Sequence, residues 1–199
     1  MIEQLVLIRH GETLQNVAGI VQGCQDSELS ERGRLHVERL AERLRSFGAD
    51  ALYSSPLGRA LTTAQAIARV TGLQVQTLDE LREMNYGGWE GKNFREVRRD
   101  DEASYRRWIG EPDFPCPEGE SHNDVLNRMK RAFEAVGGSK RPVVVAHGTA
   151  IRIGATALMN VPVSVSRQLA QDNAAFNLFV WRGERYVMKV WNDTSHCSE

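Results

Sequence analysis

The sequence predicts an α/β fold, in which a mostly parallel central sheet is covered by helices on both faces and a β-hairpin lies at the C-terminus. Two continuous apolar runs, Leu5–Ile8 and Val143–Ala146, are typical of strands buried on both faces of a parallel sheet. Strand-like and helix-like segments also alternate along the chain, as they do in βαβ units. The polar residues 182–185 separate two strand-like segments near the end, a pattern that predicts the hairpin.

The first half of the chain is predicted to contain three strands and two helices. In order, these segments are a strand at 5–8, a polar loop at 9–28, a helix of about 16 residues, a strand at 51–53, a helix at about 57–70 and a strand at 73–78. Ser30 is the predicted N-cap of the first helix. Gly48 and Gly72 stand where the C-caps of the two helices are expected.

The second half begins with a less regular stretch at 84–120, which is rich in glycine and proline around one predicted helix at 93–109. The later segments are a helix at about 121–136, a strand at 143–146, a helix to about residue 158, and hairpin strands at 176–181 and 186–191. No internal repeat interrupts this succession, so the chain is expected to form one domain.

Composition excludes several classes of protein. The 199 residues are 41% hydrophobic and 26% charged, a globular balance that leaves room for a sizeable core. The formal net charge of −1 gives no overall attraction to nucleic acid or to an anionic membrane, so neither is expected as a partner. Any attraction for a charged substrate must therefore be local.

The cysteines and the N-terminus predict a cytoplasmic protein. Cys24, Cys116 and Cys197 have no metal-ligand spacing, and free thiols in a reducing compartment are the simplest interpretation. Residues 1–4 lack the basic start of a signal peptide, and no stretch approaches the roughly 20 apolar residues that span a bilayer.

Two histidines occupy matched positions in the predicted sheet. His10 and His147 each follow the carboxyl end of a buried strand, where open α/β sheets bind ligands. Each is followed by a glycine, which lets the backbone approach a ligand closely. A single histidine at a strand end is commonly a capping or surface residue, but the matched pair favours a functional site.

Two arginines lie in the same predicted region. Arg9 precedes the first histidine, and Arg59 begins the helix that follows the strand at 51–53. Either could be a solvated surface charge. A positive side chain at a helix N-terminus is electrostatically unfavourable, because the helix dipole is already positive there. An anion bound between Arg59 and the helix N-terminus would remove this conflict. The two arginines and this helix start therefore favour an anion site.

These residues resemble the histidine phosphatase superfamily, in its phosphoglycerate mutase-like branch. Five motifs that resemble the family's follow in order, namely Leu7–Thr13 (LIRHGET), Leu29–Gly33 (LSERG), Ser54–Ala64 (SSPLGRA, then TA), Leu81–Gly91 (LRE, then GWEG), and PEGES at 117–121 with VAHG at 145–148. The resemblance spans nearly the whole chain. It implies a phosphoglycerate mutase-like fold and a single histidine phosphatase domain over residues 1–199, in which 84–120 form a substrate-covering segment.

The resemblance also implies the site residues. The catalytic set is His10 as nucleophile, Glu83 as general acid, and Arg9, Arg59 and His147 around the phosphate. The substrate-binding set is Asn16, Gln22, Gly23 and Gly148. No metal and no other cofactor are implied.

The implied reaction is hydrolysis of a small phosphorylated metabolite through a phosphohistidine on His10. Phosphoserine, α-ribazole phosphate and sugar or glycerate phosphates are the candidate substrates. Phosphoglycerate mutase is an alternative, although the mutases usually carry a longer insertion than the roughly 60 residues between Glu83 and the strand at 143–146. That compactness favours a phosphatase.

The segment expected to contact the leaving group leaves alternatives open. Its aromatic residues could touch substrate but are more often local core; they are Tyr86, Trp108 and Phe114. Its arginines could bind a second anionic group, but a solvated helix face is the simpler interpretation; they are Arg95, Arg98, Arg99, Arg106 and Arg107. His122 could touch substrate, but a position on the surface of a helix is the simpler interpretation.

Two rival classes have different sequence requirements. A metal-dependent hydrolase would use the two histidines as ligands, yet only Glu12 offers a carboxylate beside either of them, and the arginines would oppose a cation. A non-catalytic phosphate-binding module would be expected to lack the nucleophile or the acid. A homodimer is compatible with the sequence, which does not fix the oligomeric state.

Overall fold

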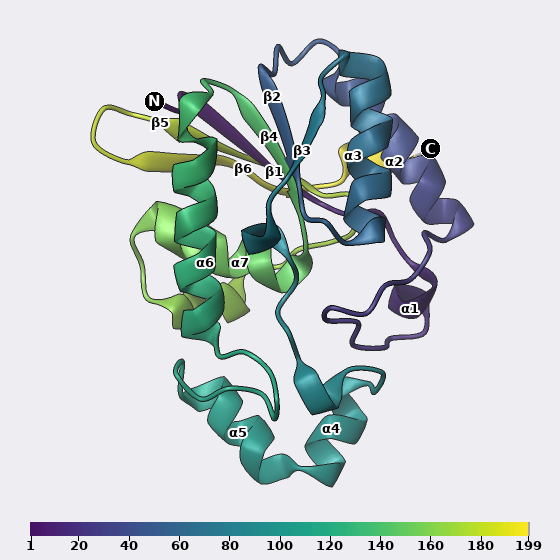
Figure 1. The fold of residues 1–199 in the computed structure, drawn as a ribbon, viewed down its shortest axis with the longest axis vertical. Coiled ribbons are helices and arrows are strands. Elements are labelled where there is room, and N and C mark those ends of the chain that lie inside the picture. Colours follow the sequence, from purple (N-terminus) through teal and green to yellow (C-terminus); the bar gives the residue numbers. More distant parts are fainter. Residues whose placement is uncertain (199) are drawn as a thin grey trace.

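A six-stranded sheet lies at the centre of the computed structural model, which describes residues 1–198 (Figure 1). Its strands are β1 (Gln4–Arg9), β2 (Ala51–Ser54), β3 (Val75–Thr77), β4 (Pro142–Ala146), β5 (Phe176–Trp181) and β6 (Tyr186–Asp193). They lie in the order β3-β2-β4-β1-β5-β6. The first four run parallel, whereas β5 pairs antiparallel with both β1 and β6. The predicted mostly parallel sheet with a terminal hairpin is confirmed.

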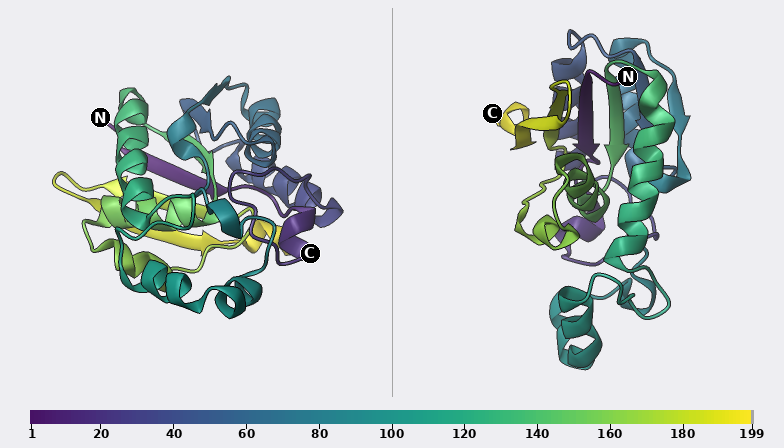
Figure 2. Two further views of the ribbon diagram at one scale, coloured as in Figure 1. Left: turned by 60° about the horizontal axis from the view of Figure 1, so that its bottom comes forward. Right: turned by 90° about the vertical axis from the view of Figure 1, so that its left-hand side faces the viewer.

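Helices cover both faces of this sheet (Figures 1 and 2). One face carries α2 (Glu31–Leu44) and α3 (Gly58–Thr71), and the other carries α6 (His122–Ala135) and α7 (Gly148–Met159). Successive residues of a strand point to opposite faces. Accordingly, Leu5 and Leu7 of β1 join the core on the α6 and α7 side, while Val6 and Ile8 join the core beside α2 and α3. This double burial explains the continuous apolar runs.

Two short helices stand apart from the sheet at one end of the molecule (Figures 1 and 2). They are α4 (Phe94–Asp100) and α5 (Glu102–Gly110), so the prediction of one continuous helix at 93–109 is wrong. Asp101 leaves the helical conformation, with φ −145° and ψ 62°, and its side chain accepts a hydrogen bond from the Ser104 amide. An aspartate that caps a new helix ends the preceding one.

The segment predicted as a loop at 9–28 contains one turn of helix, α1 (Leu14–Val17). Thr13 and Asn16 form its capping box, in which each side chain accepts a hydrogen bond from the other residue's backbone amide. Helix α2 begins after Ser30, as predicted, but ends at Leu44, before the expected position near Gly48. The short 3-10 helices are η1 (Asp79–Leu81), η2 (Gly87–Trp89), η3 (Val136–Gly138), η4 (Val163–Gln168) and η5 (Ser195–Cys197).

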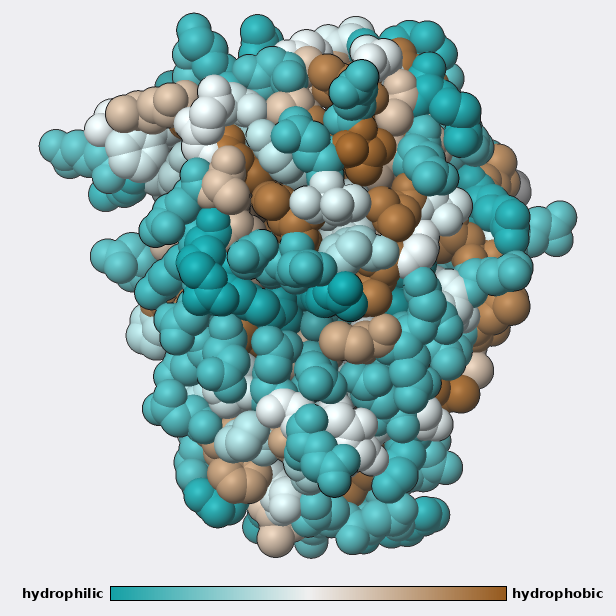
Figure 3. All heavy atoms as spheres, viewed as in Figure 1, coloured by the Kyte–Doolittle hydropathy of each residue, from teal (hydrophilic) through white to brown (hydrophobic). Residues whose placement is uncertain are grey.

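Most of the surface in the view of Figure 3 is hydrophilic, and hydrophobic residues gather in its upper half, between α6 and α3. Among residues 1–198, no helix has both the length and the apolar character needed to cross a membrane.

Candidate active site

The sheet brings the two matched histidines together. Strands β1 and β4 are parallel neighbours, so their carboxyl ends lie at the same edge of the sheet. His10 follows β1 and His147 follows β4, and their ring centroids are 5.1 Å apart. Strand β2, on the other side of β4, ends beside them at Ser54. This is the edge at which open α/β sheets bind ligands.

A cavity of about 280 Å³ opens at this edge. The sequence-predicted site residues that line it are Arg9, His10, Asn16, Gln22, Gly23, Arg59, Glu83 and Gly148. His147 does not line the cavity; it is fully buried and packs against the His10 ring. The predicted site residues therefore gather around one cavity, and His147 lies behind the His10 ring and contacts it.

His10 presents a neutral imidazole to the cavity. Its Nδ1 lies 2.7 Å from the carbonyl oxygen of Gly11, and a carbonyl can only accept, so Nδ1 carries the proton. The lone pair is then on Nε2, which makes no hydrogen bond within residues 1–198. Burial, with the positive charges of Arg59 and Arg9, lowers the pKa of His10 well below 6.5. The free protein thus holds an uncharged ring with one nitrogen available.

His147 is also neutral in the free protein. Burial lowers its pKa well below 6.5, and the charge of Arg59 acts in the same direction. Its Nε2 shares a hydrogen bond of 2.8 Å with the Ser55 hydroxyl, whereas its Nδ1 is buried without a partner in the described chain. A buried ring nitrogen without a partner is costly, and a bound group beside His10 could satisfy it.

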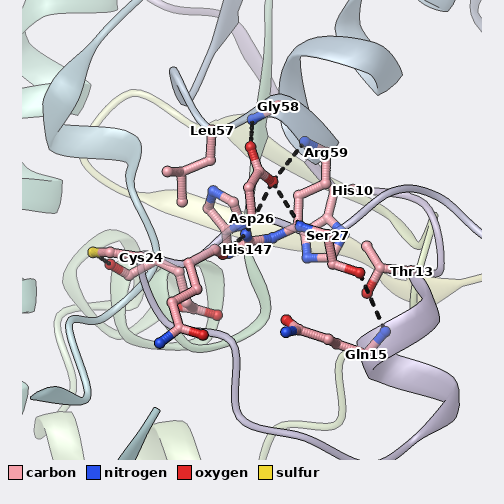
Figure 4. Close-up of polar contacts among 12 residues, drawn as sticks. His10, Thr13, Gln15, Cys24, Asp26, Ser27, Leu57, Gly58, Arg59 and His147 are labelled. Carbon is pink, nitrogen blue, oxygen red and sulfur yellow. Dashed lines mark hydrogen bonds and ion pairs between the residues drawn. The ribbon is translucent and has the colours of Figure 1, made fainter. Parts of the chain in front are cut away.

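The anion expected between Arg59 and the start of its helix belongs to the protein itself. The Asp26 carboxylate accepts hydrogen bonds from the backbone amides of Gly58 and Arg59 at the start of α3 (Figure 4). One of its oxygens also lies 3.4 Å from Nη1 of Arg59. The helix N-terminus is therefore occupied by Asp26, and a phosphate would meet the guanidinium rather than the helix amides.

The loop that contains Asp26 also fixes Arg59 through two backbone carbonyls. It is 2% exposed, and its guanidinium donates to the carbonyl oxygens of Gln25 at 2.6 Å and Gly23 at 2.7 Å. Its Nε is buried without a partner in the described residues. Gly23 has φ +54°, and a Cβ there would lie 1.9 Å from the Glu90 carboxylate. Only glycine suits this turn.

Hydrogen bonds within the protein fix the side chains of Arg9 and Asn16 but leave some of their N–H donors without a partner in the described residues. Nη1 of Arg9 donates to the backbone carbonyl of Gln171, while its Nε is buried without a partner in the described residues. The Oδ1 of Asn16 accepts from the amide and hydroxyl of Thr13 and from the side chain of Asn173. Because three donors surround this oxygen, the amide nitrogen of Asn16 is left for a ligand in the cavity.

Glu83 is positioned by the start of α7. Its carboxylate accepts hydrogen bonds from the amides of Thr149 at 3.1 Å, Ala150 at 3.0 Å and Met84 at 2.8 Å. These bonds fix a half-buried carboxyl group on the wall of the cavity that also contains His10. The sequence motif placed Glu83 correctly in this region, although nothing in its spacing indicated α7 as its support.

Several residues that line the cavity were not chosen from the sequence. The most polar of them are Arg152 and Gln171, and both amide atoms of Gln171 are buried without partners in the described residues. Arg152 follows the second histidine by five positions on α7, which was a usable signal. Gln171 lies in irregular chain between η4 and β5, where no sequence pattern marks it.

The residues considered for contact with the leaving group lie in different parts of the structure. Tyr86 lines the cavity, whereas Phe114 lies under the Arg107 guanidinium, 4.0 Å from its centre. The arginines of α4 and α5 that were considered as anion ligands line no part of it. His122 is only 6% exposed and stacks on Trp108, so its predicted surface position is wrong.

Known proteins resemble this chain along almost all of its length. The family model of the histidine phosphatase superfamily (branch 1) matches residues 5–194. Phosphoserine phosphatase 1 of Hydrogenobacter thermophilus is 35% identical over 200 residues, which cover 98% of this chain and 95% of that protein. A probable phosphoglycerate mutase GpmB of Proteus mirabilis is 33% identical over 205 residues, with 98% and 95% covered.

Solved structures agree with this relationship. Bacillus stearothermophilus YhfR superposes with a TM-score of 0.90 at 30% identity, covering 98% of this chain and 99% of that one. A mycobacterial glucosyl-3-phosphoglycerate phosphatase, solved as a complex with VO3, has a TM-score of 0.88 at 32% identity, covering 96% and 98%. From its motifs, its fold and these matches, the chain belongs to the histidine phosphatase superfamily, branch 1.

Proposed function

We propose that this protein is a phosphomonoesterase that hydrolyses a small phosphorylated metabolite through a phosphohistidine on His10. The observation that carries the proposal is the neutral imidazole, with its proton held on Nδ1 by Gly11, in a cavity that three arginines and one carboxyl group also line. The relatives named phosphoserine phosphatase and glucosyl-3-phosphoglycerate phosphatase support this class of substrate.

The first step forms a bond from Nε2 of His10 to phosphorus and breaks the bond from phosphorus to the ester oxygen. A phosphate ester repels an anionic nucleophile, so an uncharged imidazole suits this attack. The transition state spreads negative charge over three equatorial oxygens. Arg9 and Arg59 can stabilise them with planar sets of donors, and the amide nitrogen of Asn16 can add another.

His147 would support the phosphorylated state. The Ser55 hydroxyl already accepts a hydrogen bond from the Leu57 amide and can donate its own proton to Nε2 of His147. The proton of His147 then resides on Nδ1, which lacks a partner in the described chain. A phosphoryl oxygen on His10 would accept this hydrogen bond. The backbone amide of Gly148, on the cavity wall, is a further donor.

Glu83 would supply and recover the proton. An alkoxide is a poor leaving group, so the Glu83 carboxyl donates a proton to the departing oxygen. The resulting carboxylate then takes a proton from water as that water attacks phosphorus and the bond from phosphorus to Nε2 breaks. The products are an alcohol and inorganic phosphate, and Glu83 returns to its protonated form.

The wider assignments belong to the same proposal. Gln22 and Gly23 would contact the phosphate from the loop that also holds Arg59. Residues 84–120, which include α4 and α5, would cover the substrate as part of a single domain over 1–199. The reaction would need no metal ion, and the protein would work in the cytoplasm.

Chain length does not separate a phosphatase from a mutase, because the Proteus mirabilis relative named as a mutase has nearly the same length. The two activities differ in the acceptor of the phosphoryl group. With 3-phosphoglycerate as substrate, a phosphatase releases inorganic phosphate faster than it forms 2-phosphoglycerate. Faster isomerisation than release would establish the mutase instead.

Hydrolysis of p-nitrophenyl phosphate tests the proposal. The wild type should release nitrophenolate in the presence of EDTA. The His10→Ala protein should release it no faster than buffer without enzyme. A His10→Ala protein that remains as active as the wild type would contradict the assignment. Complete inactivity of the folded wild type on a panel of phosphorylated metabolites would favour a non-catalytic binding protein.

A further inference from the structure

A second cavity, of about 190 Å³, adjoins the first. Tyr86, Phe94, Thr149 and Arg152 line both, so the two spaces share one wall. The phosphate-binding groups lie only in the first cavity. The second therefore lies on the side to which the leaving group of a bound phosphate ester can extend.

The second cavity has an aromatic wall. Phe94 and Trp108 are nearly parallel, with ring centroids 5.9 Å apart and an interplanar angle of 16°. Tyr86 meets Trp108 edge-on at 6.0 Å, and His122 stacks on Trp108 at 4.7 Å. Phe94 is also 38% exposed, which is unusual for a large apolar side chain. Aromatic walls of this kind suit a flat or apolar group.

Two arginines line the same cavity without an acidic partner. Arg152 uses Nε on the Gly148 carbonyl and one Nη2 proton on the Thr149 hydroxyl, at 3.3 Å and 2.9 Å. A guanidinium has five N–H donors, so three of them have no partner within residues 1–198. Arg167 is exposed and makes no ion pair or hydrogen bond in that range.

Neighbouring arginines behave differently. Arg106 and Arg107 on α5 form ion pairs with Glu102 and Glu111 at 2.8 Å and 2.9 Å. All four of these side chains are exposed, and none of them lines either cavity. Arg95 and Arg98 on α4 also lack an ion pair in the described residues, but neither lines a cavity; Arg152 and Arg167 are the arginines without an acidic partner there that line the second one.

The positive charges of Arg152 and Arg167 both act on His122, which also lines the second cavity. Burial and then the positive charges of Arg167 and Arg152 lower the pKa of His122 to about 4. His122 is therefore neutral at pH 7 and adds no charge of its own. An anionic group in this space would meet two guanidinium groups with free donors and no competing carboxylate among the lining residues.

Resting on the proposed phosphatase activity, we propose that this second cavity binds the leaving group and selects alcohols that combine an apolar body with a second anionic group. The aromatic rings contact the apolar body, and Arg152 and Arg167 bind the anion. Arg152 lies at the boundary of the two cavities, and Arg167 lies only in the second. The two residues are specificity determinants, distinct from Arg9 and Arg59 at the phosphate.

A matched pair of substrates tests this selectivity. Benzyl phosphate carries the apolar body alone, and 4-(phosphonooxymethyl)benzoate adds a carboxylate to the same ring. For the wild type, kcat/KM should be at least about tenfold higher for the carboxylated ester, which corresponds to one hydrogen bond between charged groups. Arg167→Gln and Arg152→Gln should each lower this ratio toward one. Arg98→Gln, an exposed arginine on α4 outside both cavities, should leave the ratio unchanged.

The outcomes separate this inference from the proposed function. If the wild type hydrolyses both esters with equal kcat/KM, or if the ratio persists in both folded variants, the subsite is wrong while the phosphatase activity stands. If the wild type hydrolyses p-nitrophenyl phosphate but neither benzyl ester, the subsite is wrong while the phosphatase activity stands; if it hydrolyses none of the three esters, both proposals fail. Loss of the ratio in Arg98→Gln as well would also overturn the assignment to Arg152 and Arg167.

Discussion

At the scale of single residues, one hydrogen bond decides the chemistry of His10. The Gly11 carbonyl holds the proton on Nδ1 and leaves the lone pair on Nε2, the nitrogen that we propose as the nucleophile. The position of His10 after a buried strand was predictable from the sequence, because apolar runs and the residues that follow them are local features. Its tautomer was not, since it depends on the geometry of the turn at Gly11.

Glu83→Gln tests the proposal that Glu83 is the proton donor. The amide cannot donate a proton to an alkoxide, so kcat/KM for benzyl phosphate should fall by about 10²–10⁴-fold. The loss for p-nitrophenyl phosphate should be much smaller, because nitrophenolate leaves without protonation. Steady-state kinetics on the two esters measure this difference.

A half-buried neighbour outside the cavity provides the control for this prediction. Glu80→Gln lies on the same stretch of chain and outside the cavity, and it should affect neither substrate. Equal losses for the two esters in Glu83→Gln would remove Glu83 from the role of acid.

At the scale of secondary-structure elements, α3 depends on an aspartate from a distant loop. Asp26 caps the helix and holds Arg59, yet it lies 32 residues before Gly58, whose amide is the first in the helix to donate to it. The sequence indicated that an anion was needed at this helix start. It could not show that the loop at 9–28 supplies it, because that contact is made only in the folded chain.

Asp26→Ala should therefore affect both stability and activity. Loss of a helix cap lowers the free energy of unfolding by about 1 kcal/mol. The released Arg59 guanidinium should also raise KM and lower kcat/KM. Urea denaturation and kinetics on p-nitrophenyl phosphate measure the two effects.

Glu28→Ala is the matched control for Asp26→Ala. Its carboxylate is exposed and pairs only with an exposed arginine at 3.3 Å, so it should change stability by less than about 0.5 kcal/mol. An Asp26→Ala protein as stable and as active as Glu28→Ala would contradict the capping role.

The helical segment at 93–110 shows where sequence patterns mislead. The apolar spacing of Phe94, Val97, Tyr105 and Trp108 fits one helix, because all four side chains face the same aromatic cluster. The break at Asp101 preserves that shared face across two helices. The capping preference of aspartate was the signal for two helices, and the periodicity masked it.

At the scale of the whole molecule, the fold was predictable but the cavities were not. Buried strands and the alternation of elements determine a parallel sheet, and the order of the sheet places His10 and His147 together. The second cavity is formed where α4, α5, α6, α7 and η4 meet. No local pattern encodes such a meeting, and His122 was consequently expected at the surface.

The buried histidines make stability depend on pH. For His122, the folded pKa of about 4 lies below the unfolded value of about 6.5, so the unfolded chain binds a proton first as the pH falls. The stability is therefore complete above about pH 6.5 and is lost progressively down to about pH 4. One such group contributes a slope of about 1.4 kcal/mol per pH unit in this window.

His122→Phe should remove this contribution while keeping the stacking on Trp108. Urea unfolding between pH 7 and pH 4.5 should show a shallower loss of stability in the variant than in the wild type. His36→Phe is the comparison variant, because His36 is a half-buried histidine that lines neither the first nor the second cavity. Identical pH slopes for wild type and His122→Phe would show that His122 titrates normally.

The most direct test of the central claim is to trap the phosphorylated protein. Turnover of a ³²P-labelled phosphate ester is quenched with alkali, in which phosphohistidine survives, and the labelled peptide is identified by mass spectrometry. We predict an acid-labile phosphoryl group on His10 in the wild type and none in His10→Ala. A label on a serine or cysteine, or turnover with no covalent intermediate, would contradict the account.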